Sequence, residues 1–130
     1  MADIVDLICT HMEFLGYEIT RRDGGAVTAK HQTHFNVVFK QYGYGILFSA
    51  FFGINAEGKA RKESTSLRCN AFNKEARVAR AYLDDDVDLV LEATFPVMYD
   101  KAAFGVFLEA FNNDLRLFAK DTVRLAEYMM

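Results

Sequence analysis

The sequence predicts an α+β fold in which one antiparallel sheet packs against helices, and three features of the 130-residue chain lead to this prediction. Apolar residues recur at helical spacing near both ends of the chain. Between these ends, apolar residues alternate with polar ones or form continuous runs, as they do in strands. Turn-forming residues separate the segments at short intervals. The expected order is α-β-β-β-α-β-β-α, in a single domain over residues 1–130.

The first helix is expected over about residues 3–15. Its apolar residues share one face of a helix, and they are Ile4, Leu7, Ile8, Met12 and Leu15. Asp3 is a suitable N-cap residue, because a carboxylate can accept hydrogen bonds from the first free amides. Gly16 can end the helix, since glycine adopts the left-handed conformation at little cost.

Three strands are expected next. The first begins at Tyr17 and ends at a turn over residues 22–25. The second follows a period of two from Val27 to Phe39, with an irregularity near residues 32–33. The third is expected over residues 46–54, where β-type residues run without a break.

A helix within residues 60–75 and a hairpin complete the sheet region. The hairpin strands are expected over residues 77–83 and 88–95, around the acidic turn at residues 84–86. Pro96 ends the last strand, and Asp100 can cap a final helix that reaches about Tyr128. The apolar stripe of this helix comprises Phe104, Phe107, Leu108, Phe111, Leu115, Phe118 and Leu125.

Composition limits the partners and the location of the protein. The formal net charge of −3 provides no overall attraction to nucleic acid or anionic lipid. No apolar run approaches the ~20 residues of a membrane span, and the N-terminal region lacks the features of a secretory signal. We therefore expect a cytoplasmic protein. Cys9 and Cys69 are expected to be free buried thiols rather than a disulfide.

The polar motifs do not predict catalytic, cofactor or metal sites. On a strand, His31 and His34 would point to opposite faces, so they could not share one metal ion. His11 is expected at the edge of the core. The acidic residues 84, 86 and 88 imitate the start of a calcium loop, but Leu89 and Phe95 occupy the positions that need Gly and Glu. A solvated hairpin turn is the better interpretation.

The third strand gives the clearest functional signal, because both of its faces are apolar. One face carries Ile46, Phe48, Ala50, Phe52 and Ile54, and the other carries Leu47 and Phe51 with Ser49 and Gly53. A second apolar face needs cover, which its own helices, a dimer mate or a client peptide could provide. Leu47, Phe51 and Val90 are predicted to be exposed partner-binding positions.

The region from residue 67 to 95 resembles the YbjN-like family, described as sensory transduction regulators of bacteria. The resemblance rests on Asn70-Ala71-Phe72-Asn73, Arg77, Arg80-Ala81-Tyr82-Leu83-Asp84 and Asp88-Leu89-Val90-Leu91. The chain departs from the family pattern in two places. Phe72 stands where the family often has Trp, and Val87 stands where Gly is expected in the hairpin turn.

The resemblance implies a fold similar to the small dimeric chaperones of type III secretion. It implies a non-enzymatic, chaperone-like or regulatory protein that forms a homodimer and binds an extended client protein. Leu67, Ala71 and Phe72 are the expected dimer-interface residues. The alternative is a small-ligand-binding or catalytic α+β domain, with its pocket between the sheet and the C-terminal helix.

Overall fold

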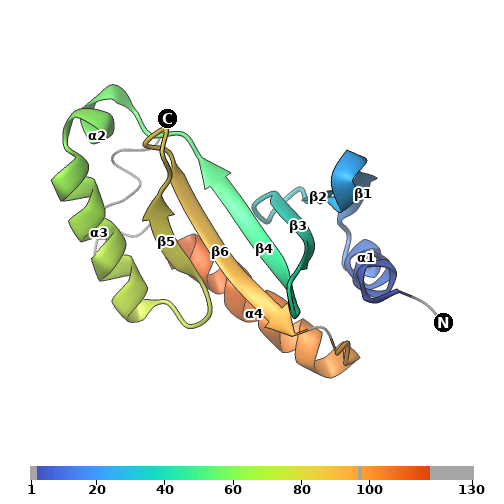
Figure 1. Cartoon of the computed structure of the whole chain (residues 1–130). Helices are drawn as coiled ribbons and strands as arrows, with labels where there is room; N and C mark the ends of the chain where they lie inside the picture. The colour runs from blue at the N-terminus through green and yellow to red at the C-terminus, as the bar shows by residue number, and fades with distance from the viewer. Residues whose placement is uncertain (1–2, 97, 118–130) are drawn as a thin grey trace.

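A six-stranded antiparallel sheet forms the centre of the structure, a computed structural model that describes residues 3–96 and 98–117 (Figure 1). The strand order is β1-β2-β3-β4-β6-β5. The strands are β1 (Glu18–Arg21), β2 (Val27–Lys30), β3 (Val37–Tyr42), β4 (Gly45–Phe52), β5 (Arg80–Leu83) and β6 (Leu89–Pro96). The helices are α1 (Ile4–Phe14), α2 (Ala56–Ala60), α3 (Lys62–Glu75) and α4 (Lys101–Leu117), with a short 3-10 turn η1 (Asp23–Gly25). The α+β prediction is confirmed.

The C-terminal end of α1 and the start of α4 follow the predicted signals. Asp3 occupies the N-cap position of α1, but its carboxylate accepts no capping hydrogen bond from the described residues, so that part of the prediction is wrong. Gly16 follows α1 with a φ of 96°, which glycine adopts without a Cβ clash. The Asp100 carboxylate accepts a hydrogen bond from the Ala103 amide at 2.8 Å, so it caps α4. The predicted stripe positions Phe118 and Leu125 lie outside the described residues. In the part of the chain that is described, no helix is long and apolar enough to cross a membrane.

The prediction of one strand from Val27 to Phe39 is wrong, because this segment forms two antiparallel strands, β2 and β3. The loop between them is organised by His31. Its Nδ1 accepts hydrogen bonds from the amides of Thr33 at 3.0 Å and His34 at 3.3 Å, and its Nε2 lies 3.2 Å from the Leu15 carbonyl oxygen. These bonds turn the chain and fasten the loop to the end of α1.

Two further boundaries differ from the expectation. Residues 56–60 form the short helix α2, which begins after Asn55 because the Asn55 side chain accepts a hydrogen bond from the Gly58 amide at 2.8 Å. The first hairpin strand begins at Arg80 instead of residue 77. The three preceding amides bind a side chain on α4, so they cannot pair with a strand.

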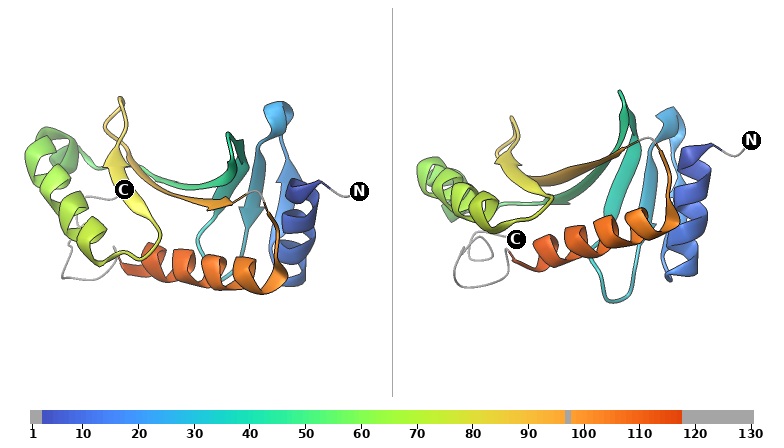
Figure 2. Two further views of the ribbon diagram at one scale, coloured as in Figure 1. Left: turned by 60° about the horizontal axis from the view of Figure 1, so that its bottom comes forward. Right: turned by 90° about the horizontal axis from the view of Figure 1, so that it is seen from below.

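The hydrophobic core lies between α4 and one face of the sheet (Figure 2). Phe48 is at its centre and is fully buried. Its ring centroid lies 5.0 Å from Phe39 on the neighbouring strand, and 5.8 Å and 5.3 Å from Phe104 and Phe107 on α4. Because aromatic rings fill the layer between the sheet and α4, this layer fixes the position of the helix.

Two polar side chains join the helices to β5 and to the segment just before it. The Asp114 carboxylate on α4 accepts hydrogen bonds of 2.8–3.1 Å from the amides of Arg77, Val78 and Ala79. The Asn73 side chain on α3 bonds both backbone groups of Ala81, with its Oδ1 2.7 Å from the amide nitrogen and its Nδ2 3.1 Å from the carbonyl oxygen. Together they hold α3, β5 and α4 in one arrangement.

Val87 carries backbone strain in the β5–β6 turn, where its φ is 61°. The left-handed region costs roughly 1–2 kcal/mol for a residue with a Cβ, and a β-branched side chain suits it least. We expect Val87→Gly to raise the free energy of unfolding by about 1 kcal/mol in urea titrations. As a control, Val38→Gly in the extended strand β3 should lower it by about 0.5–1 kcal/mol. Destabilisation by both substitutions would show that the turn is unstrained.

Candidate protein-binding surface

The face of the sheet turned away from α4 is concave, and no helix of the described residues lies across it (Figure 2). We call it the open face. Strand alternation and the pairing register place Val38, Lys40, Leu47, Ser49, Phe51, Arg80, Tyr82, Val90 and Glu92 on it. One of the two apolar faces of β4 therefore packs on the core, and the other faces outward.

The three predicted contact positions differ in exposure. Phe51 is 60% exposed, and Leu47 is half-buried. Val90 is only 3% exposed, so its predicted exposure is wrong. The register explains the difference, because Val90 on the interior strand β6 is paired with Phe51 on one side and Tyr82 on the other. Two large aromatic side chains flank one short side chain.

Sequence reasoning missed Val38 and Tyr82, which extend the open face on both sides of β4 and β6. Tyr82 is 43% exposed, and its hydroxyl donates to the Glu92 carboxylate at 3.2 Å. Burial, followed by the Glu92 charge, raises the pKa of Tyr82, so its hydroxyl stays protonated and can donate. The only sequence signal for both residues is the alternation of side chains along a strand. This alternation identifies the open face only when the pairing register of the strands is known.

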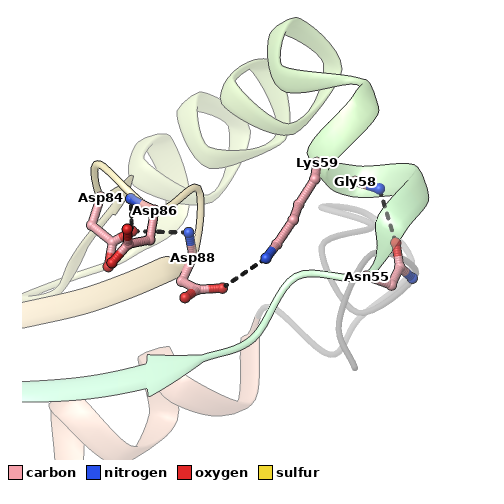
Figure 3. Close-up of polar contacts among 6 residues, drawn as sticks. All are labelled: Asn55, Gly58, Lys59, Asp84, Asp86 and Asp88. Atoms are coloured by element: carbon pink, nitrogen blue, oxygen red, sulfur yellow. Dashed lines mark hydrogen bonds and ion pairs between the residues drawn. The ribbon is translucent and has the colours of Figure 1, made fainter.

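The acidic turn lies where β5 joins β6, at one end of the open face (Figure 3). The Asp84 carboxylate accepts hydrogen bonds from the amides of Asp86 at 2.9 Å and Asp88 at 3.0 Å. Asp88 in turn faces the Lys59 ammonium of α2, with 3.9 Å between the charged atoms. The predicted hairpin turn is confirmed, and the Asp84 carboxylate holds the turn in shape.

The outward side of α3 carries two of the three predicted dimer-interface residues. Leu67 is 67% exposed and Ala71 is half-buried, and both line a hollow of about 620 Å³ with Asn70 and Lys74. Phe72 is fully buried in the core, so its prediction as a surface residue is wrong. Thr65 and Cys69 are the other buried residues of α3. Phe72 lies seven residues after Thr65 and three after Cys69, so all three side chains share one face of the helix.

The two histidines of the β2–β3 loop lie side by side, contrary to the expectation that they point to opposite faces of a strand. Their ring centroids are 4.5 Å apart, and Tyr17 packs against both rings. His34 Nδ1 accepts a hydrogen bond of 2.8 Å from the Arg116 guanidinium on α4. Because a guanidinium has no acceptor, His34 must carry its proton on Nε2. In the described ranges, no group of three His, Cys, Asp or Glu side chains could hold a metal ion.

From the surroundings of His34 and His11 we expect acid to destabilise the protein. Burial, His31 and Arg116 lower the pKa of His34, and burial and Lys101 lower the pKa of His11. The unfolded chain, with an ordinary histidine pKa of about 6.5, therefore binds these protons more readily. The contribution of the two neutral histidines to the free energy of unfolding is complete above the unfolded-state pKa and is lost as the pH falls below it. We expect a lower urea midpoint at about pH 5.5 than at about pH 7.5.

The variant His34→Gln tests the source of this pH dependence. Glutamine retains an acceptor for Arg116 but does not titrate, so the difference between the two midpoints should shrink. An unchanged difference would show that His34 does not contribute.

The cysteines are free and buried, as predicted. Burial raises the pKa of Cys69 to about 11, and burial also raises the pKa of Cys9. Both groups therefore remain thiols at neutral pH and are poor nucleophiles. His11 lies at the edge of the core, as predicted, with its Nδ1 2.8 Å from the Tyr99 hydroxyl oxygen.

Comparisons with known proteins identify the family of this chain and agree with its fold. The sequence model of the family "YbjN: Putative bacterial sensory transduction regulator" matches residues 5–121. The chain belongs to the YbjN family. The resemblance seen in residues 67–95 is thereby confirmed and extends over most of the YbjN-type chain. No curated protein matches it.

Two solved structures share the YbjN fold. The crystal structure of YbjN from E. coli superposes with a TM-score of 0.73 at 18% identity, covering 97% of this chain and 95% of that one. A chain of the heterodimeric ExoU–SpcU complex, from the type III secretion system of Pseudomonas aeruginosa, superposes with a TM-score of 0.60 at 18% identity. That match covers 83% of this chain and 92% of the other. At such low identity the likeness shows a common fold, which is the predicted chaperone-like one.

Proposed function

We propose that this YbjN-family protein is a non-enzymatic, chaperone-like or regulatory protein-binding module of the cytoplasm, built as one domain over residues 1–130. The open face holds an extended apolar segment of a client protein. The observation that carries this proposal is Phe51, a large aromatic side chain near the C-terminal end of β4 that is 60% exposed on a sheet face that no described helix covers. The ExoU–SpcU structure supports it, because a chain of the same fold there belongs to a heterodimeric complex of a type III secretion system.

The energetics of the open face favour a bound segment. Burying a phenylalanine side chain is worth roughly 1.5–3 kcal/mol, so Phe51 gains most from a partner. Leu47 extends the apolar area along β4 itself, and Val38 extends it onto the neighbouring strand β3. Polar Ser49 and Glu92, which are paired across β4 and β6, can select the polar groups of the client.

The proposed homodimer uses the outward side of α3. Leu67 and Ala71 are one helical turn apart there and lie beside the hollow that can receive a side chain of the other copy. A two-fold axis across α3 would place each Leu67 against the equivalent surface of the second copy. The opposite, buried side of α3 holds Phe72 in the core and keeps the helix in place.

The layer between β4 and α4 gives no support to the alternative function, a ligand pocket at that place. Phe48 on β4 and Phe104, Phe107 and Phe111 on α4 are in ring contact across that layer. A ligand there would have to displace part of the core.

Client binding is tested by Phe51→Asp, with Tyr44→Asp as the matched control. Tyr44 is 98% exposed in the β3–β4 turn, away from the strands of the open face. Affinity purification from the native host should recover a partner with the wild-type chain and with Tyr44→Asp, and lose it with Phe51→Asp. Equal recovery with both variants, or no partner with the wild type, would contradict the proposal.

The oligomeric state is tested separately by light scattering during gel filtration. The wild-type chain should have twice the mass of the monomer at high micromolar concentration, and Leu67→Asp should shift it toward the monomer. The matched control is Val106→Asp, because Val106 is 69% exposed on α4. A wild-type monomer at every concentration would remove the dimer from the proposal and leave the client surface in place.

A further inference from the structure

A pocket of about 320 Å³ lies between α1, the β2–β3 loop and α4. It is separate from the open face, since it lies on the helical side of the sheet. Leu15 and Leu108 provide apolar walls, and Tyr17, His34, Glu109 and Arg116 provide polar ones. Gly105 and Asn112 complete the surface that α4 presents to it.

Gly105 is an unusual residue for the interior of α4. A glycine there lowers helix stability relative to alanine, so it normally reflects a close approach by another group. No such approach exists at this position, because an added Cβ would meet no atom within 4 Å. The missing side chain therefore leaves open space, and that space belongs to the pocket.

Asn112 is the second unfavourable residue on the same pocket. Its side chain is 7% exposed, and its Nδ2 donates to the Tyr17 hydroxyl oxygen at 3.1 Å. Its Oδ1 is buried without a hydrogen-bond partner among the described groups. A buried amide oxygen without a partner costs stability. Gly105 and Asn112 both lower the stability of the fold, and both line the same pocket. Residues that cost stability are typical of functional sites such as ligand pockets.

Charged groups lie on both sides of Asn112 along α4. Arg116 is one turn beyond it, and Glu109 nearly one turn before it. Arg116 donates to His34 Nδ1 at 2.8 Å and to Asn113 Oδ1 at 2.7 Å, which are both neutral acceptors. Neither Arg116 nor Glu109 forms an ion pair within the described part of the chain. The pocket therefore offers one cation and one anion that form no ion pair with another described residue.

We propose that this pocket binds a free amino acid with an apolar side chain. The ligand carboxylate lies against the Arg116 guanidinium, which retains donors for it. The ligand ammonium donates to Asn112 Oδ1, after a small rotation of the amide, and faces Glu109. The apolar side chain lies over Gly105 between Leu15 and Leu108. A water molecule occupies about 30 Å³, so the pocket has room for about ten non-hydrogen atoms.

The test is an NMR titration of the full-length protein with L-leucine. The backbone amide of Gly105 and the side-chain amide of Asn112 should show saturable shifts. The matched analogues are 4-methylpentanoate, which lacks the ammonium group, and 3-methylbutylamine, which lacks the carboxylate. Each should bind at least about tenfold more weakly, because each leaves one charge of the pocket without a partner. Sodium chloride at equal concentrations controls for ionic strength.

Two variants locate the site. Gly105→Leu should fold normally, since leucine favours a helix and the space is open, and it should abolish the shifts. Arg116→Gln should weaken binding about tenfold, whereas Arg61→Gln, an exposed arginine outside the pocket, should not change it. The proposal is overturned if L-leucine gives no saturable shifts, if Gly105→Leu retains them, or if an analogue binds equally well. These results leave the client-binding experiments unaffected.

Discussion

Replacing Asp114 by alanine is expected to lower the free energy of unfolding by about 4 kcal/mol. The carboxylate is 4% exposed and accepts hydrogen bonds from three successive amides, those of Arg77, Val78 and Ala79. Without it these donors lose their partner, and at least the Ala79 amide is too deep to reach water. Small domains are stable by only about 5–15 kcal/mol, so this loss is a large share of the total.

Urea unfolding measures this effect, and two variants separate its causes. Asp114→Asn retains one acceptor oxygen and should fall between the wild type and alanine. Glu109→Gln removes an exposed carboxylate from the same helix and should change the stability by less than about 0.5 kcal/mol. If Asp114→Ala matched Glu109→Gln, the three amides would have other partners in solution.

Phe48→Ala is expected to cost about 3–5 kcal/mol, through lost burial and the cavity left behind. Phe48 is fully buried and packs against rings of β3 and α4. Phe51→Ala is the matched control, with the same change on the same strand but on the open face. It should cost less than about 1 kcal/mol, because the Phe51 ring is 60% exposed.

The pair also tests the central geometric claim of the proposed function. Equal losses for Phe48→Ala and Phe51→Ala, measured in urea at low protein concentration, would mean that both faces of β4 are covered. A loss for Phe51→Ala that appears only at high concentration would indicate that a second copy covers the open face.

Local patterns were sufficient to predict most of the fold. The helical spacing of α1 and α4, and the alternation around the acidic turn, depend on neighbours within a few residues. The break at residues 31–36 could not be predicted in this way, because His31 bonds Leu15 in a distant element. The late start of β5 has the same kind of cause, since Asp114 lies more than 30 residues beyond the amides that it binds.

The binding surface could be predicted only in part. Phe51 follows from the alternation along β4. The burial of Val90 depends on its cross-strand neighbours Phe51 and Tyr82, which no local pattern reveals. The sequence prediction places Phe72 on the outward side of α3 and is wrong, although the spacing of Phe72 from Cys69 and Thr65 already separates it from Leu67. Gly105 and Asn112 lie seven residues apart in the sequence, and only the folded structure brings them onto one pocket.

The hydrogen bonds from Asn73 to Ala81 restrict how a partner can be recognised. Strand β5 lies at the edge of the sheet, where an incoming peptide could add a seventh strand through backbone pairing. The Asn73 amide occupies both backbone groups of Ala81 that such a strand would need. At Ala81 this edge is closed to strand addition, so the proposed client would be recognised along β5 by side-chain contacts, which tolerate many sequences of similar shape and polarity.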